Sequence, residues 1–379
     1  MEKGNSWVKP LPNVSIRVSC LWLTQQKKPI LLYVGSSPTY PTITAATVKQ
    51  IIKEQNMSFV PQFEDAARVQ CKASIEFEGL SGTGKSGAAI LTAAILAGYD
   101  WKKVFACDTE NRSLRLLVGT PCSDGNKYGS FKVAELTPDI GYAPSNYLAI
   151  REAAINAGAK VFVQDSISHA WQYKGGVLDK VSDAKNSGNR LYAKDAYAAW
   201  GDPEVMAEKN KLLEMIRDER VHVISTVRVK EKMEYTKDAE GKTKLESLGE
   251  QQIQQGDLKY EPDLVLHMVR PGSNRNGVVI HPRVRVVKTR YAFLEKDEEY
   301  DWTPELITQL KCYLEEGVDP ETIFEQQRQE YISALREMVK EPSKKAIAEV
   351  MKEDLGCKDI KLADMPLDKI KKLYIGMSA

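Results

Sequence analysis

The stretch SIEFEGLSGTGKS, residues 74–86, decides how the rest of the sequence is interpreted. Its first residues alternate between apolar and acidic side chains, which predicts a β-strand over residues 74–78. The glycine-rich run GLSGTGKS, residues 79–86, then matches the pattern GxxxxGK[ST], and small and apolar residues at 87–97 predict a helix. A strand, a glycine-rich turn and a helix in this order predict a phosphate-binding loop rather than a chance turn.

Each residue type in this loop has a chemical role. Glycines allow successive backbone N–H groups to converge on a phosphate, and the helix that follows adds its partial positive charge. Lys85 is expected to reach the β- and γ-phosphates, and the Ser86 hydroxyl is expected to bind Mg²⁺. The predicted nucleotide-binding residues are Gly79, Ser81, Gly82, Thr83, Gly84, Lys85 and Ser86.

Carboxylates follow two further apolar runs. The run VFVQD at 161–165 places Asp165 at the end of a predicted strand, where it is expected to hold Mg²⁺ through water. The run VFAC at 104–107 ends in Asp108 and, two residues later, Glu110. Glu110 is the candidate general base for the water that attacks the γ-phosphate, so Lys85 and Glu110 are the catalytic candidates. The alternative for Glu110 is an ordinary helix-capping role before a predicted helix at 112–118.

The spacing of these runs predicts the fold class. Predicted strands at 74–78, 103–107, 161–164, 221–225, 264–268 and 283–288 alternate with helical stretches, which is typical of an α/β protein with a mainly parallel sheet flanked by helices. We expect an N-terminal extension at 1–70, a core at 71–302 and a small helical region at 303–379. Met57 would make a natural start of its own, so the residues before it are treated as an extension or a mis-assigned start.

Composition excludes several classes of protein. Of the 379 residues, 42% are hydrophobic and 28% charged, which is typical of a soluble globular protein and not of a disordered one. The 53 basic and 52 acidic residues nearly cancel, so the overall charge indicates neither nucleic acid nor a membrane as partner. No run approaches the roughly 18 apolar residues of a membrane span. The cysteines are widely spaced without companion histidines, which disfavours zinc and disulfides and fits a cytoplasmic location.

The order of these motifs resembles the RecA-like ATPase core, in which a glutamate after the second strand is the catalytic base. More closely, residues 57–302 look like the phage-encoded RecA-like AAA-domain ATP-binding proteins, some of which are single-strand annealing recombinases. This resemblance implies a P-loop ATPase with ATP as substrate and Mg²⁺ as cofactor, in the cytoplasm of a bacterial host. It is carried by PQFE at 61–64, DSIS at 165–168, VISTVRVK at 223–230 and GDLKYEPD at 256–263.

The resemblance also implies roles at two later strands. Thr226 and Arg228 fall where this fold places a γ-phosphate sensor, although no glutamine occupies that strand end as it does in bacterial recombinases. Lys288 and Arg290 match basic residues that contact the ATP of a neighbouring subunit in RecA filaments, which implies a filament or ring of identical subunits. The alternative for this pair is a solvated edge strand whose charges prevent aggregation.

Two long polar segments, 172–202 and 229–256, follow the strands that carry Asp165 and Thr226. In the RecA-like fold the equivalent loops touch single-stranded DNA, so Lys230, Lys232 and Tyr235 are candidate DNA contacts, combining phosphate-pairing cations with a stacking ring. Plain solvated loops are the alternative. Single-stranded DNA and a phage single-strand binding protein are the expected partners.

Two functions of different class therefore stay open. The first is an ATP-dependent protein of phage recombination or replication that acts on single-stranded DNA. The second is an ATPase switch, such as a helicase loader or a DNA-packaging accessory, without recombinase activity. The long lysine-bearing segments favour the first. A small-molecule kinase is weaker than either, because the sequence has no arginine cluster typical of a lid.

Overall fold

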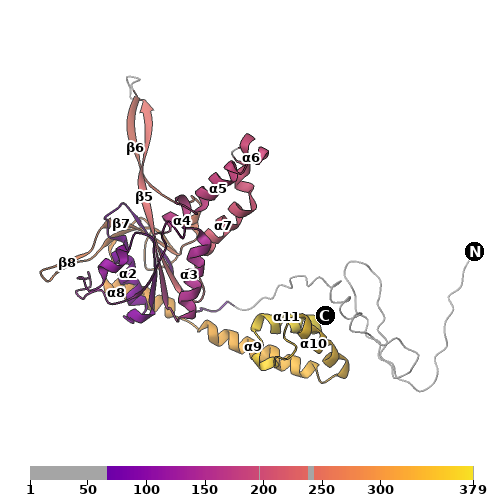
Figure 1. Cartoon of the computed structure of the whole chain (residues 1–379). Coiled ribbons are helices and arrows are strands. Elements are labelled where there is room, and N and C mark those ends of the chain that lie inside the picture. Colours follow the sequence, from indigo (N-terminus) through magenta and orange to yellow (C-terminus); the bar gives the residue numbers. More distant parts are fainter. Residues whose placement is uncertain (1–65, 196, 238–242, 379) are drawn as a thin grey trace, which may run out of the picture. The chain divides into compact units, whose positions relative to one another are not determined.

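The computed structural model describes residues 66–195, 197–237 and 243–378. In these residues, nine strands form one sheet whose main path runs β11-β10-β7-β1-β5-β4-β2-β3, with β6 paired to β5 (Figure 1). The strands from β7 to β3 along this path are parallel, whereas β10, β11 and β6 pair antiparallel. The strands are β1 (Ser74–Gly79), β2 (Val104–Asp108), β3 (Lys132–Glu135), β4 (Val161–Asp165), β5 (His222–Lys237), β6 (Thr243–Gln252), β7 (Leu264–Arg270), β10 (Arg283–Thr289) and β11 (Glu299–Asp301).

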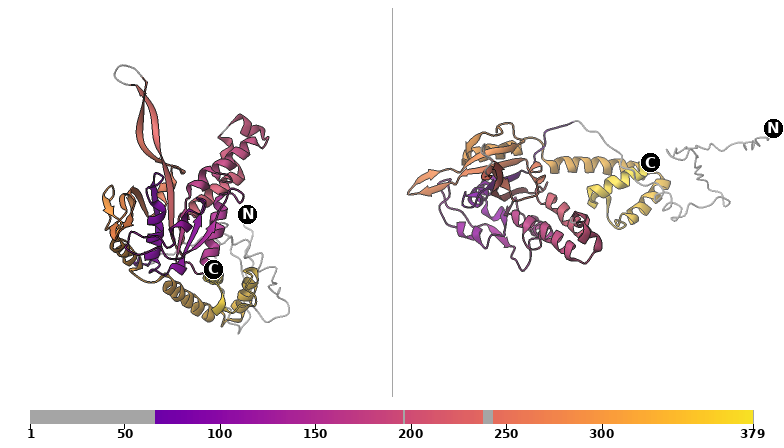
Figure 2. Two further views of the ribbon diagram at one scale, coloured as in Figure 1. Left: turned by 60° about the vertical axis from the view of Figure 1, so that its left-hand side comes forward. Right: turned by 90° about the horizontal axis from the view of Figure 1, so that it is seen from above.

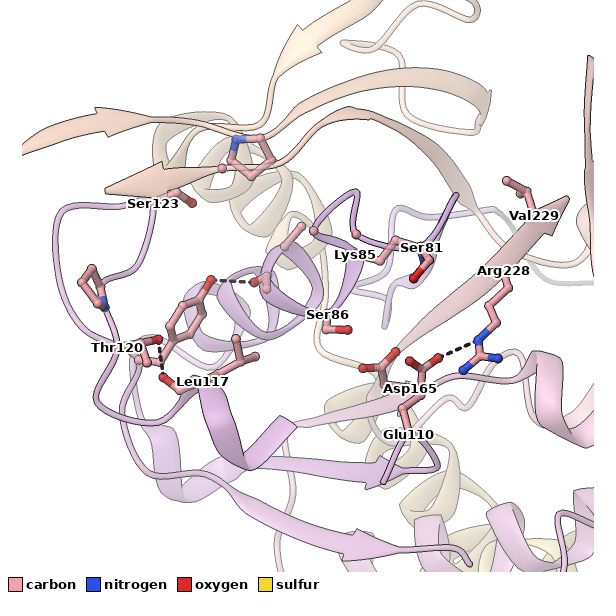
Figure 3. A pocket seen from close by; sticks show the side chains of 18 of the residues that line it. Ser81, Lys85, Ser86, Glu110, Leu117, Thr120, Ser123, Asp165, Arg228 and Val229 are labelled. Atoms are coloured by element: carbon pink, nitrogen blue, oxygen red, sulfur yellow. Dashed lines mark hydrogen bonds and ion pairs between the residues drawn. The ribbon is translucent and has the colours of Figure 1, made fainter. Parts of the chain in front are cut away.

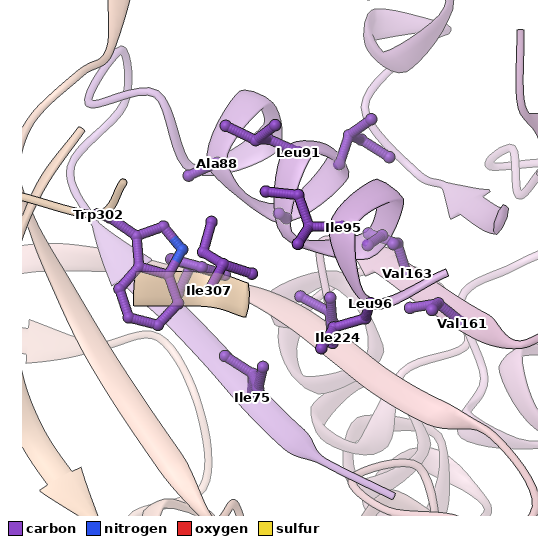
Figure 4. Packing of buried hydrophobic residues seen from close by; sticks show 14 of the residues in the cluster. Ile75, Ala88, Leu91, Ile95, Leu96, Val161, Val163, Ile224, Trp302 and Ile307 are labelled. Carbon is purple, nitrogen blue, oxygen red and sulfur yellow. The ribbon is translucent and has the colours of Figure 1, made fainter. Parts of the chain in front are cut away.

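Helices pack on both faces of this sheet. On one face, α2 (Lys85–Leu96) and α8 (Pro304–Glu315) bury apolar side chains against β1 and its neighbours, in the cluster drawn in Figure 4. The other face is covered by α3 (Pro144–Asn156), α4 (Ser168–Gln172) and α7 (Pro203–Glu214). The central strands are buried on both faces, and β2 and β4 accordingly read as nearly continuous apolar runs, whereas β1 buries Glu76 and Glu78 as well. The predicted α/β class with a mainly parallel sheet is confirmed.

All six predicted strands are present, but β5 is much longer than expected. It continues beyond residue 225 to Lys237 and pairs with β6 as a hairpin that extends well away from the sheet (Figure 1). The interpretation of 229–256 as a long loop is therefore wrong. A second small hairpin, which no sequence pattern indicated, joins β8 (Ser273–Arg275) and β9 (Val278–Ile280).

The other polar segment, 172–202, is largely helical rather than a loop. It contains α5 (Val177–Asn186), α6 (Arg190–Lys194) and the 3₁₀ helix η3 (Ala198–Gly201), which pack on one another and on α7. Val181, Ala184 and Ala199 form a small buried cluster with Val205 of α7. In Figures 1 and 2 this helical segment and the β5–β6 hairpin rise from the same edge of the sheet and diverge from each other.

The core extends further along the chain than the predicted boundary at residue 302. The compact unit runs from Arg68 to Val318, because Ile307, Leu310 and Leu314 of α8 pack into the same cluster as α2. Met57 lies outside the described residues, and only residues 66–70 of the predicted N-terminal extension lie within them. Short 3₁₀ helices complete this unit: η1 (Trp101–Lys103), η2 (Ser113–Leu117) and η4 (Leu258–Tyr260).

From Asp319 onward the chain belongs to a second compact unit. It contains α9 (Pro320–Met338), α10 (Pro342–Asp354), η5 (Leu362–Asp364) and α11 (Leu367–Ser378). These helices bury their own cluster of apolar residues, which includes Ile332, Leu335, Met351, Ile370 and Leu373. The expected helical character of the C-terminal region is thus present. None of the helices in the described residues combines the length and the apolar character that a membrane span requires.

Trp302 links the end of the sheet to α2. Its indole Nε1 donates a hydrogen bond of 2.9 Å to the Thr92 hydroxyl, and its ring meets Phe77 edge-on with centroids 6.1 Å apart. The side chain is fully buried between β1, α2 and α8, as Figure 4 shows. The chain enters α8 directly after this residue, so Trp302 fixes the position at which α8 begins.

Replacing Trp302 by Ala should therefore lower the free energy of unfolding by about 3–5 kcal/mol, because a large cavity opens and a buried hydrogen bond is removed. A urea titration followed by circular dichroism measures this. The control is Leu116→Ala, at a side chain that is 78% exposed, where a change within about 0.5 kcal/mol is expected. A loss below about 1 kcal/mol for Trp302→Ala would contradict its role in the core.

Candidate nucleotide-binding and catalytic site

The glycine-rich run forms a tight turn between β1 and α2. Gly82 and Gly84 have φ angles of +81° and +85°, a left-handed conformation that glycine adopts without steric cost. A Cβ atom at Gly84 would also lie only 2.8 Å from Pro271 Cβ. The first turn of α2 starts immediately at Lys85, so the helix N-terminus faces the turn. This is the geometry of an anion-binding loop at a helix N-terminus.

The Lys85 ammonium group lies inside this loop. Its Nζ donates hydrogen bonds to the carbonyl oxygens of Gly79 at 2.9 Å and Leu80 at 2.7 Å. Burial lowers the pKa of Lys85, while the nearby carboxylates of Glu110 and Asp165 act in the opposite direction. A buried cation held in a turn that exposes a helix N-terminus is suited to bind the phosphates of a nucleotide.

Asp165 ends β4 at the same edge of the sheet and is fully buried. Burial raises its pKa to about 6, although hydrogen bonds from the Ser86 and Thr226 hydroxyls oppose this shift. In the described part of the chain, its second oxygen, Oδ2, has no hydrogen-bond partner. The sequence prediction that Ser86 and Asp165 lie together is therefore met, and Thr226 lies beside them.

These residues fit a Mg²⁺ ion. An unpartnered buried carboxylate oxygen next to a hydroxyl supplies the hard oxygen ligands that Mg²⁺ prefers. Throughout the described ranges, no cluster of three or more His, Cys, Asp or Glu side chains could hold a metal ion by itself. A metal at this position would therefore depend on phosphate oxygens and water for its remaining ligands.

Glu110 and Arg228 form an ion pair at the wall of the same cavity (Figure 3). Arg228 Nε donates to Glu110 Oε1 at 2.9 Å, and both side chains are partly buried. Glu110 comes two residues after the end of β2, and Arg228 pairs with Gly79 across β1 and β5. The candidate base and the candidate sensor are thus in direct contact, which no sequence pattern indicated.

The cavity, of about 570 Å³, extends from the phosphate loop to a region where the sequence predicted no site residue. One wall is the connection between η2 and β3, with exposed Thr120 and buried Tyr128, whose hydroxyl donates to the Gly87 carbonyl at 3.2 Å. The β7–β8 and β9–β10 connections contribute Gly272 and Pro282. The clustering of Gly119, Thr120 and Pro121 marks a turn but carries no chemical signature in the sequence.

The structure places Lys288 and Arg290 away from this cavity. Thr289, between them, pairs with Leu264, which itself pairs with Ile75 near the start of β1, so both lie at the opposite edge of the sheet from the phosphate loop. Lys288 Nζ donates to the carbonyl oxygens of Tyr260 and Pro262, and Arg290 forms an ion pair of 3.2 Å with Asp263. A contact with a neighbouring subunit's nucleotide stays a prediction.

The candidate DNA contacts lie on the β5 strand of the β5–β6 hairpin. Lys230 is exposed and pairs with Gln251, and Tyr235 pairs with Leu245 further along. Lys232 lies at an irregularity between Glu231 and Met233. The hairpin also returns Gln252 and Ile253 to the side of Arg228, since Gln252 pairs with Val229 and Ile253 N donates to the Arg228 carbonyl. The Gln252 side chain donates to the carboxylates of Glu76 and Glu78 on β1, whereas Ile253 lines the cavity.

Together, the parallel sheet, the glycine-rich turn and the Asp165 strand define a P-loop nucleotide-binding protein. An AAA domain family model matches residues 73–301, more than half of the chain, and the protein belongs to this family of P-loop ATPases. The matched residues span β1 to β11 and contain every residue of the cavity. The comparison with curated proteins found no match.

The pKa of Asp165 makes nucleotide binding depend on pH. Because this pKa is raised from 3.8 to about 6, the carboxylate is mostly ionised at pH 7 and mostly protonated at pH 5. Affinity for Mg²⁺-nucleotide should therefore fall by up to roughly tenfold per pH unit below 6. Calorimetric titration between pH 5 and pH 8 measures this.

Asp165→Asn is the matched control, since the phosphates of the nucleotide titrate equally with both proteins. The variant should bind Mg²⁺-nucleotide weakly at every pH, with a smaller pH dependence than the wild type. Equal pH dependence for the two proteins would show that Asp165 does not hold the metal.

Proposed function

We propose that this protein hydrolyses ATP with Mg²⁺ and acts on single-stranded DNA in phage recombination or replication. The observation that carries the proposal is the meeting of Lys85, Asp165, Glu110 and Arg228 in one cavity, at the edge from which the hairpin and the helical segment rise. A protein that binds and releases a nucleotide without hydrolysing it does not need a carboxylate base beside the phosphate loop. The projecting elements supply a surface for a polymer next to that base.

In the proposed reaction, the Lys85 ammonium binds the β- and γ-phosphates. Ser86 and Asp165 would hold Mg²⁺, which when bound would neutralise charge on the phosphate oxygens. Glu110 accepts a proton from the water whose oxygen bonds to the γ-phosphorus, while the bond from that phosphorus to the bridging oxygen of ADP breaks. Arg228, which lines the same cavity, is placed to bind the γ-phosphate and stabilise the charge that develops there.

The support for a DNA partner comes from the positions of exposed lysines and arginines near the cavity, not from the net charge of the protein. Exposed cations occur on both elements that rise beside the cavity, among them Lys230 on the hairpin and Lys174, Lys185 and Arg190 on the helical segment. A single strand lying between these elements could pair its phosphates with both. The formal charge of +1 is an average over the chain and does not oppose this local arrangement.

The proposal includes assembly into a filament or ring, in which Lys288 and Arg290 would contact a neighbouring subunit. Both are bonded within their own subunit to residues 260–263, so assembly would have to exchange these bonds for new ones. A phage single-strand binding protein is the proposed protein partner. It would deliver coated DNA to the projecting elements.

Replacing Glu110 by Gln should separate catalysis from binding. The amide cannot accept the proton of the attacking water, so turnover should fall by roughly 10²–10⁴-fold. Affinity for a non-hydrolysable ATP analogue should stay within about threefold, because Glu110 is not expected to bind the phosphates. Steady-state phosphate release and calorimetric titration measure the two quantities. Lys85→Ala is the contrasting variant, and it should lose both. Full turnover by Glu110→Gln would rule out Glu110 as the base.

The DNA surface can be tested by removing two cations from the hairpin. The double variant Lys230→Ala, Lys232→Ala should weaken binding to an oligothymidylate and reduce the slope of log affinity against log salt by about 0.7 for each phosphate that is no longer neutralised. Fluorescence anisotropy at several salt concentrations measures this. Lys102→Ala, at an exposed lysine in η1, is the control and should leave the slope unchanged. Absence of salt-dependent binding in the wild type would favour the ATPase switch.

A further inference from the structure

In the described residues Arg228 donates hydrogen bonds to three side chains, and two of these belong to residues 168–173, directly before the helical segment. Its backbone N–H donates to Ser168 Oγ at 2.9 Å, and its Nη1 donates to the Tyr173 hydroxyl at 3.3 Å. Ser168 starts α4, and Tyr173 follows its last residue. The third partner is Glu110. The arginine is therefore held between the candidate base and the helical segment, while its own strand continues into the β5–β6 hairpin.

The ion pair with Arg228 restrains Glu110. Its Oε1 accepts a charge-assisted hydrogen bond at 2.9 Å, which occupies one oxygen of the carboxylate. It also directs the carboxylate toward Arg228 instead of toward water at the γ-phosphate. For Glu110 to act, Arg228 must leave it, and a triphosphate in the cavity offers the arginine an alternative anion.

The residues around Tyr173 give this contact a fixed geometry. The Tyr173 ring meets His169 edge-on with centroids 4.3 Å apart, and it meets Tyr142 edge-on at 6.1 Å. His169 Nδ1 lies 2.5 Å from the hydroxyl of Thr109, the residue that precedes Glu110. Burial, reinforced by the positive charge of Arg228, lowers the pKa of His169 to about 4, so the ring is neutral at pH 7. His169 therefore contacts Thr109, which precedes Glu110, and Tyr173, which binds Arg228, so neutral rings link the two residues of the ion pair.

We infer that Tyr173 is a positioning residue that holds Arg228 on Glu110 and so couples the helical segment to the catalytic base. Movement of α4 away from β5 would stretch the bond from Arg228 to Tyr173 and ease the transfer of the arginine from Glu110 to the γ-phosphate. A DNA strand bound along the helical segment would act on the base by this route. The inference rests on the proposed ATP hydrolysis, and its DNA-dependent part rests on the proposed partner.

The test is Tyr173→Phe, which keeps the ring against His169 and removes the hydroxyl that binds Arg228. The ratio kcat/KM for ATP without DNA should rise by roughly three- to tenfold, the equilibrium factor of one hydrogen bond, because Arg228 no longer has to break its bond to Tyr173 when it moves to the γ-phosphate. If DNA stimulates the wild type, the ratio of stimulated to basal turnover should fall in the variant. An unchanged or reduced basal kcat/KM in the variant would overturn the inference.

Tyr142→Phe is the matched control. Tyr142 lies against the same two rings, and removing its hydroxyl leaves the Arg228–Tyr173 bond in place, so turnover should stay within about twofold of the wild type. An equal rise in both variants would assign the effect to loosened packing and overturn the role of the hydroxyl. Wild-type protein without any ATP turnover would instead refute the proposed function, so the two failures are distinguishable.

A structure of the wild-type protein with Mg²⁺ and a non-hydrolysable ATP analogue provides a readout that does not depend on turnover. The inference expects the Arg228 guanidinium on the γ-phosphate and Glu110 free of it. An Arg228–Glu110 pair that persists at hydrogen-bond distance with the γ-phosphate in place would overturn it.

Discussion

The parallel pairing of β1, β5, β4 and β2 is the constraint on which the rest of this site depends. Gly79 pairs with Arg228, Gln164 pairs with Ser225, and Asp108 pairs with Asp165, so β1, β4 and β2 end at nearly the same level, where β5 continues into the hairpin. Residues that follow those ends must meet at one edge of the sheet. This is why a glycine-rich turn, a buried aspartate, a glutamate and an arginine from distant parts of the chain line one cavity. Burial of both faces by α2, α3 and α7 keeps the strands at this register.

The same burial sets the electrostatics of the site. Desolvation opposes the ionised forms of both Lys85 and Asp165, and each is kept in place by hydrogen bonds, to the carbonyls of the turn for Lys85 and from neighbouring hydroxyls for Asp165. Charges that are costly to bury are stabilised further when a ligand of complementary charge arrives. The pairing of Arg228 with Glu110 satisfies two charges in the same way. In the proposed mechanism this pair must open before Glu110 can act as the base.

Sequence patterns were misleading where the chain leaves the core. The segment 229–256 is predicted as a loop because it is mostly polar and charged, although VRVKEKMEYT at 227–236 alternates between apolar and polar residues except at 231–232, where the pairing is irregular. The segment 172–202 is predicted as a loop because its helices are short and separated by glycines. The sequence groups α8 with the C-terminal region, because an amphipathic helix does not indicate which core its apolar face joins. Only its contact with α2, far away in the sequence, assigns α8 to the core.

The sequence by itself determined the phosphate loop, the strands of the core and the carboxylates at their ends, because each of these depends on local requirements. Glycine permits the positive φ angles, a lysine and a serine follow it, and apolar runs form buried strands. The tertiary structure alone shows that Arg228 pairs with Glu110 and contacts Tyr173, that the hairpin returns Ile253 to the cavity, and that Trp302 packs with α2 and α8 in the core. These contacts join residues whose separation in the chain carries no periodic signal, so they exist only once the strands are in register.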